Sequence, residues 1–179
     1  MKKRLAGMML AGCMLALISA AQQPVISSMG VGELRILQTQ QQVEKLLGKK
    51  LSIRSKQANE RGIDTVWTEY LGMRLQLVFS YYTMMDDDLP SPKLYSIYTD
   101  AAGAKTRSGI APGDDKFDII KKLDGRRLTI GPDWQKEALP DKQRYSVVRL
   151  SDYDNSTFLN FYFVDNKLVA FEVGVEEGC

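Results

Sequence analysis

The densest group of side chains that could do chemistry is the acidic run Asp86-Asp87-Asp88, which two prolines follow closely. Three neighbouring carboxylates have three common uses. They keep a surface loop solvated, they enter a basic pocket of another protein, or they bind calcium through several oxygens. In the second use, Met84, Met85 and Leu89 supply adaptable apolar flanks. The Asp-x-Asp-x-Asp-Gly spacing of a calcium loop is absent, so we expect no metal site.

Other reactive groups are sparse. The chain has 179 residues and no histidine, which excludes imidazole bases, Ser-His-Asp triads and most zinc sites. It also lacks a Gly-x-Ser-x-Gly elbow, a phosphate-binding glycine loop and a Ser-x-x-Lys motif. The remaining candidate carboxylates are scattered, and their spacing identifies no acid–base pair: Glu69, Asp118, Glu137, Glu172, Glu176 and Glu177. We therefore expect a protein that is not an enzyme and needs no cofactor.

A second candidate surface follows from the alternation of side chains along predicted strands. Leu75, Leu77, Phe79 and Tyr81 share one face of a strand, and the polar residues between them share the other. The second half repeats this pattern, and Tyr98 and Glu172 extend the outward strip. Tyrosine and arginine are typical of protein-binding faces, although aromatic residues also stabilise strands by cross-strand pairing. The candidate partner contacts on this face are Arg74, Gln76, Tyr82, Tyr98, Asn160 and Tyr162.

The N-terminus predicts export. The basic start Met1-Lys2-Lys3-Arg4 precedes the uncharged run Leu5–Ile18 and the small residues Ser19-Ala20-Ala21, as in a bacterial secretory signal. The run is shorter than the roughly 20 residues that span a bilayer. We expect cleavage of residues 1–21, a periplasmic location and no membrane span in the mature chain. Removing the signal's cations from the 24 basic residues leaves 21 against 22 acidic ones, a net charge of −1 that gives no basic field for nucleic acid.

An alternative reading concerns Leu10-Ala11-Gly12-Cys13, which fits the box before a lipid-modified cysteine of bacterial lipoproteins. Lipid on Cys13 would anchor the protein to the outer membrane. Against this, the apolar run continues through Met14–Ala21, where a polar tether is expected. If the signal is removed, Cys179 is the only thiol and no internal disulfide can form. The sequence leaves the oligomeric state open.

An internal repeat organises the rest of the chain. Gly48-Lys49-Lys50-Leu51-Ser52-Ile53 recurs 77 residues later as Gly125-Arg126-Arg127-Leu128-Thr129-Ile130. A short amphipathic helix precedes each copy. The first begins at the capping box of Thr39 and Gln42, buries Val43, Leu46 and Leu47, and ends at Gly48. The second begins at Asp114 or Asp115, buries Phe117, Ile120 and Leu123, and ends at Gly125.

Strand patterns follow each copy of the repeat. We expect strands at Thr65–Tyr70, Met73–Tyr82 and Leu94–Thr99, then at Arg144–Leu150, Thr157–Val164 and Lys167–Val175. Asp100–Ser108 is the predicted linker. The predicted fold class is α+β: two tandem repeats, 22–100 and 101–179, each a helix followed by an antiparallel meander, with the helices packed on one face of the sheet. Trp67 is expected in the core, and the environment of Trp134 is left open.

This order of elements resembles the beta-lactamase inhibitory protein family and the wider superfamily of small outer-membrane lipoproteins of the SmpA/OmlA type. The opening of their repeat matches Ile110, Gly113, Asp114, Ile120 and Leu123-Asp124-Gly125, and more loosely Ile36, Thr39, Val43 and Leu46-Leu47-Gly48. The resemblance implies the tandem fold and a hairpin loop of the first repeat that plugs an enzyme's active site. No cysteine pair corresponds to the inhibitor's disulfides, which leaves the partner open.

Together these features predict a periplasmic, non-catalytic protein-binding module, similar to an inhibitor or an immunity protein. It would occlude an enzyme of the cell envelope with its sheet face and its acidic loop. Two alternatives remain. One is an envelope-assembly or structural lipoprotein anchored at Cys13, and the other is a carrier that holds a small ligand in an aromatic-lined cleft between the repeats.

Overall fold

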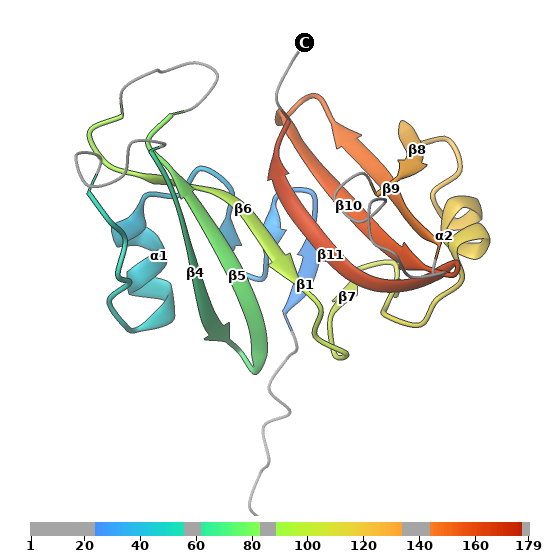
Figure 1. The fold of residues 1–179 in the computed structure, drawn as a ribbon, viewed down its shortest axis with the longest axis horizontal. Helices are drawn as coiled ribbons and strands as arrows, with labels where there is room; N and C mark the ends of the chain where they lie inside the picture. Colours follow the sequence, from blue (N-terminus) through green and yellow to red (C-terminus); the bar gives the residue numbers. More distant parts are fainter. Residues whose placement is uncertain (1–23, 56–61, 83–88, 134–143, 177–179) are drawn as a thin grey trace, which may run out of the picture.

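A computed structural model of the chain describes residues 24–55, 62–82, 89–133 and 144–176 (Figure 1). Within them the protein is mostly β, with 49% of residues in strands and 11% in helices. The elements are β1 (Val25–Ser27), β2 (Gly30–Val31), β3 (Leu34–Arg35), α1 (Gln40–Leu47), β4 (Ile63–Tyr70), β5 (Met73–Ser80), β6 (Lys93–Thr99), β7 (Lys105–Thr106), α2 (Lys116–Lys122), β8 (Leu128–Pro132), β9 (Tyr145–Asp152), β10 (Thr157–Val164) and β11 (Lys167–Val175).

The strands form two sheets. The larger has seven strands in the order β4-β5-β6-β11-β10-β9-β8, and all its neighbours are antiparallel. The smaller has four short strands in the order β3-β2-β1-β7, in which β1 and β7 are parallel. In Figure 1, β6 and β11 lie side by side at the centre, and α1 and α2 lie near opposite ends. The pairing of β1 with β7 links the segment before α1 to the segment before α2.

The predicted α+β fold, with two helix-plus-meander repeats and helices packed over one sheet face, is wrong: the protein is mostly β, with two sheets and two short helices. The helices have 8 and 7 residues, so at ~1.5 Å per residue they are only about 12 and 10 Å long. Seven strands spaced by about 4.8 Å make a sheet roughly 29 Å wide, which two such helices cannot cover. No helix of the described residues is long and apolar enough to cross a membrane.

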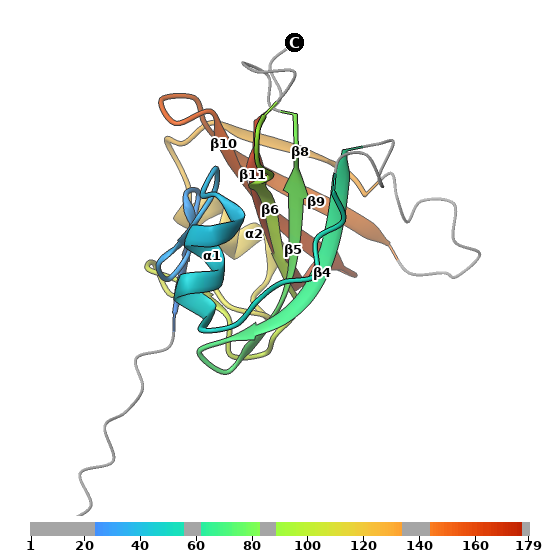
Figure 2. The same ribbon diagram turned by 90° about the vertical axis from the view of Figure 1, so that its left-hand side faces the viewer.

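The small sheet supplies the cover that the helices lack. Figure 2 shows α1 and the N-terminal strands on the same side of β4–β6. Ile26, Val31 and Leu34 of the small sheet are buried in one core cluster with the inward side chains of the large sheet. Those inward side chains are Leu75, Leu77, Phe79, Leu94, Ile97, Phe161, Phe163, Phe171 and Val173. The core therefore lies on one face of the large sheet, opposite the face that carries Trp67 and Gln76.

The predicted starts of both helices and the end of α1 are confirmed, whereas α2 ends at Lys122, before the predicted Gly125, and one predicted core position is exposed. Thr39 caps α1 in a capping box with Gln42, and Gly48 ends it in the left-handed conformation. Asp115 caps α2, where its side chain accepts the Phe117 N–H. Phe117 was expected in the core and is 64% exposed, whereas Ile119 is fully buried. The helix turns Ile119 inward, at the same distance from its N-cap as Val43 in α1.

The strands match the predictions best where the alternation of side chains is longest. β10 and β11 have the predicted bounds. A register shift between Val78 and Phe79 disturbs the alternation at the end of β5, so Ser80, expected on the outer face, is buried. The two copies of the repeat also differ, because Leu128–Pro132 forms β8 while residues 51–55 form no strand. Arg54 is held instead by the carboxylate of Asp64.

A buried carboxylate fixes the end of α1. Glu44 is 7% exposed. Its Oε1 accepts the Leu51 N–H and the Gln40 Nε2–H, both at 2.9 Å, and its Oε2 accepts Lys50 Nζ at 2.9 Å. The Leu51 N–H above all, and then Lys50, lower the pKa of Glu44 from 4.5 to about 2. The second residue of the first basic pair thus closes the turn after the helix.

This contact makes a pH-dependent contribution to stability. Because the folded pKa lies below the ordinary value, the stabilisation is complete above pH 4.5 and is lost as the pH falls toward 2. We expect Glu44→Gln to lower the urea midpoint at pH 7, and the difference from the native protein to shrink steadily below pH 4.5. Glu33→Gln, at an exposed position, is the control and should leave both curves unchanged. A difference that stays constant down to pH 2.5 would contradict this role of Glu44.

Candidate functional site

The outer face of the large sheet, opposite the core, carries one row of side chains that crosses every strand. Each member lies directly opposite the next in the strand pairing, from β4 to β8. We call it the central row. Its members, in order, are Trp67, Gln76, Tyr98, Glu172, Asn160, Arg149 and Thr129. An indole, a phenol, two amides, a carboxylate and a guanidinium therefore share one surface.

At the β4 end of the row, an arginine stacks on a tryptophan. The guanidinium carbon of Arg74 lies 4.1 Å from the centre of the Trp67 ring. The same indole meets the Tyr98 ring edge to face, with ring centres 6.5 Å apart. Trp67 was expected in the core, and that expectation is wrong, because the indole is 43% exposed. Strand parity explains it, since Trp67 pairs with the outward Gln76 while its neighbour Val66 pairs with the buried Leu77.

At the β9 end, Arg149 is held on three sides. Its Nε donates to Asn160 Oδ1 at 3.0 Å, and its Nη1 lies 3.4 Å from Glu176 Oε1. Its guanidinium also covers the Phe158 ring at 4.2 Å. Phe158 has the same parity in β10 as Asn160, and its ring is buried beneath Arg149. At this end of the row, Arg149, Asn160 and Glu176 form a network of polar contacts that packs on the Phe158 ring.

The centre of the row combines two tyrosines with a carboxylate. The Tyr162 hydroxyl donates to Glu172 Oε2 at 2.5 Å, and Asn160 Nδ2 donates to the same oxygen at 3.2 Å. Burial, followed by the charge of Glu172, raises the pKa of the Tyr162 hydroxyl. Burial also raises the pKa of Tyr98, with Asp100 and Glu172 as lesser causes. Both phenols therefore stay protonated at neutral pH, and that of Tyr162 is the donor to Glu172.

A small cavity opens at this centre, where the first half of the chain meets the second. It has a volume of about 240 Å³ and is lined by Gln76, Tyr98, Tyr162, Glu172 and Asp133, among others. Pockets for whole small molecules usually measure roughly 300–1,000 Å³. The cavity is therefore closer in size to one large side chain than to a metabolite.

The structure brings five of the predicted contact residues to this face: Arg74, Gln76, Tyr98, Asn160 and Tyr162. Tyr82 lies past the end of β5, where its ring packs against Gly62. The acidic run Asp86–Asp88 and Cys13 lie outside the described residues, as do Trp134 and Cys179. Sequence reasoning missed Trp67, Arg149 and Asp133 as members of this face. The alternation of side chains along β9 held the signal for Arg149, Trp67 also needed the register of β4 against β5, and Asp133 follows β8 and has no such pattern.

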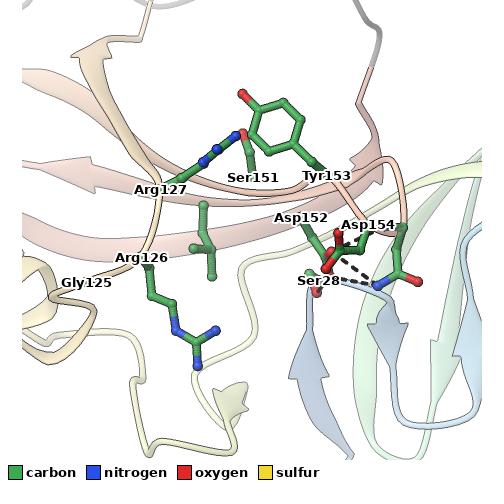
Figure 3. Close-up of a pocket in the computed structure, with 10 residues that line it drawn as sticks. Ser28, Gly125, Arg126, Arg127, Ser151, Asp152, Tyr153 and Asp154 are labelled. Carbon is green, nitrogen blue, oxygen red and sulfur yellow. Dashed lines mark hydrogen bonds between the residues drawn. The ribbon is translucent and has the colours of Figure 1, made fainter.

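A second depression lies at the turn between β9 and β10 (Figure 3). It measures about 490 Å³ and is more open than the cavity in the sheet face. Arg127, the second residue of the second basic pair, stacks on the Tyr153 ring at 4.9 Å. Asp152 accepts hydrogen bonds from Ser28 and Asn155. Arg126, Arg127 and Asp154 are exposed, and the hydrogen bond from Ser28 to Asp152 connects the β1–β2 turn to the β9–β10 turn.

The chain matches no protein-family model, no curated protein and no solved structure. The resemblance to the beta-lactamase inhibitory proteins therefore stays a prediction.

The hydrogen bonds of Asn160 predict its share of the stability. Its side chain is 3% exposed and joins Arg149 to Glu172 and Tyr162. Asn160→Ala removes the hydrogen bonds that join these groups, so we expect the free energy of unfolding to fall by about 2 kcal/mol. Gln76→Ala removes the amide at the matching place in the row, which forms no side-chain hydrogen bond with the described residues, and should cost much less. Equal losses in urea denaturation would show that the network does not order this face.

Proposed function

We propose that this protein is an exported, non-catalytic binding module that docks onto a protein of the cell envelope with the outer face of its large sheet. Inhibition or neutralisation of an envelope enzyme by occlusion is the activity we assign to it. The observation that carries the proposal is the central row: a line of aromatic and polar side chains that crosses every strand on the sheet face opposite the core.

Physical features of the row favour a protein as the partner. Tryptophan, tyrosine and arginine dominate the energetics of protein interfaces. Tryptophan and tyrosine bury large areas with little loss of conformational freedom. Here Trp67, Tyr98 and Arg149 are held in place by stacking and hydrogen bonds before any partner arrives. Such pre-organisation lowers the entropic cost of association.

The acidic segment Asp86–Asp88 is the second proposed contact. It lies between Tyr81 and Leu89, whose backbones are joined by a hydrogen bond of 3.0 Å at the end of β5. Its charges would supply electrostatic fit to a basic pocket of the partner and raise the association rate. The alternative of a small-ligand carrier is less favoured, because the cavity between the two halves is only about 240 Å³.

Site-specific photo-crosslinking tests the docking face. A benzoylphenylalanine at position 76 or 98, in the central row, should form a discrete adduct with one envelope protein when the protein is made in its native cells. The same residue at position 117, exposed on α2, is the matched control and should form none. We expect Trp67→Ala combined with Arg74→Ala to reduce the adduct at least about tenfold, as the loss of two interface anchors predicts.

An adduct at position 117 with none at 76 or 98 would move the interface to the other side of the molecule. Replacing Asp86, Asp87 and Asp88 by Ala should lower the adduct yield as well. Unchanged yield would remove the acidic segment from the mechanism while leaving the sheet face as the docking site.

The proposed location is tested separately. Mass spectrometry of the mature protein should give an N-terminus at Gln22, which corresponds to cleavage after Ala21. A diacylglyceryl group on Cys13 would instead favour the envelope-assembly lipoprotein. Cys13→Ser provides the control, because it should leave export unchanged if the signal ends at Ala21 and should abolish anchoring if Cys13 carries lipid.

A further inference from the structure

We infer that the cavity at the centre of the sheet face is a receptor for an arginine side chain of the partner protein. The inference rests on the proposed function and specifies the chemistry of its central contact. Tyr98, Tyr162 and Glu172 would bind the guanidinium.

The charge of the cavity calls for a cation. Glu172 lines it, and no lysine or arginine is among its described lining residues. Glu172 forms no ion pair with the described part of the chain, whereas Glu176 and Glu44 each have one. The carboxylate of Glu172 therefore attracts a positively charged group to the cavity.

The hydrogen bonds of Glu172 leave one of its carboxylate oxygens available for that group. Tyr162 and Asn160 both donate to Oε2 of Glu172 and hold the carboxylate in one orientation. No side chain among the described residues donates to Oε1. A carboxylate with one oxygen fixed and the other open is well prepared to accept a charge-assisted hydrogen bond from an incoming donor.

The protein's own arginines show which cation suits this surface. Arg74 covers the Trp67 ring at 4.1 Å, and Arg149 covers the Phe158 ring at 4.2 Å while pairing with Glu176. Each therefore rests its flat guanidinium on an aromatic ring. The centre offers the same elements, since the Tyr98 and Tyr162 rings lie 6.2 Å apart beside Glu172, but the described chain places no arginine there.

Arginine fits the cavity better than lysine does. Its planar guanidinium stacks on aromatic rings and donates from several N–H groups at once, while the lysine ammonium is a compact and strongly hydrated charge. With a volume of about 240 Å³, the cavity suits one extended side chain. The lining offers acceptors at Glu172 and Gln76 for the guanidinium edge.

Nuclear magnetic resonance with small probes tests the pocket without the partner. The full mature protein is titrated with N-acetyl-arginine methylamide, and the ring signals of Tyr98 and Tyr162 are followed. We expect saturable shifts at both rings. N-acetyl-citrulline methylamide has the same shape without the charge and should bind at least about tenfold more weakly, since a charge-assisted hydrogen bond is worth roughly that factor or more. The lysine analogue should fall between them.

Glu172→Gln should weaken the arginine probe about tenfold, whereas Glu69→Gln, on the same face but outside the cavity, should not change it. Equal binding of the citrulline probe, or equal shifts in the native protein and Glu172→Gln, would overturn the inference. The citrulline comparison needs no variant, so it decides the question even if Glu172→Gln folds poorly.

The two proposals can fail separately. If the arginine probe binds but crosslinking from position 76 yields no partner, the pocket stands and the docking function fails. If the adduct at position 76 forms equally with Glu172→Gln and is lost with Trp67→Ala and Arg74→Ala, the docking face stands and the arginine pocket fails.

Discussion

The pairing of β6 with β11 is the contact on which the rest of the structure depends. Four residues on each strand, 96–99 and 171–174, join two antiparallel meanders into one large sheet. The approach is close at Gly174, where a side chain would place its Cβ 2.6 Å from the Phe158 ring and 3.3 Å from Ser96. This seam sets Tyr98 opposite Glu172, and so it builds the central row and the cavity at the same time. A longer side chain at Gly174 would have to displace Phe158, and with it the ring on which Arg149 rests.

The backbone repeats one arrangement on both sides of the seam. Leu37 donates its N–H to Leu94, which donates its own to Gln38. Gly113 and Leu168 do the same with Asp114. Each set joins the N-terminus of a helix to the first residues of the strand at the seam, and the helix caps Thr39 and Asp115 form matching bridges to Lys93 and Lys167. The side chains at the two places differ, because Lys50 closes a turn on Glu44 whereas Arg127 stacks on Tyr153.

The parts of the fold that sequence reasoning found are those with strong local signals. Capping boxes, left-handed glycines and long alternation fixed α1, β10 and β11. The fold class was wrong because β1, β2 and β3 have only two or three residues each, too few for any period to appear, and yet they cover the core. The alternation of side chains along β5 predicted Arg74 and Gln76 on the outer face. The face of Trp67 depended on how β4 pairs with β5, which the sequence of β4 alone does not fix. The meeting of Tyr98 with Glu172 depends on pairing across some 70 residues, which local patterns do not encode.

The electrostatics of the sheet face follow from how each charge is balanced. Arg149 forms an ion pair with Glu176 and donates a hydrogen bond to Asn160, so its positive charge is balanced within the protein. Glu172 is stabilised by a phenol and an amide, and neither of these donors carries a charge. Neutral donors lower the cost of partial burial but leave the net charge in place, so the field of the carboxylate persists at the surface. An arginine of the protein paired with Glu172, as Arg149 is paired with Glu176, would have cancelled the field of this carboxylate. Its persistence between two tyrosine rings makes this face selective, because it favours a cationic partner surface and opposes an acidic one.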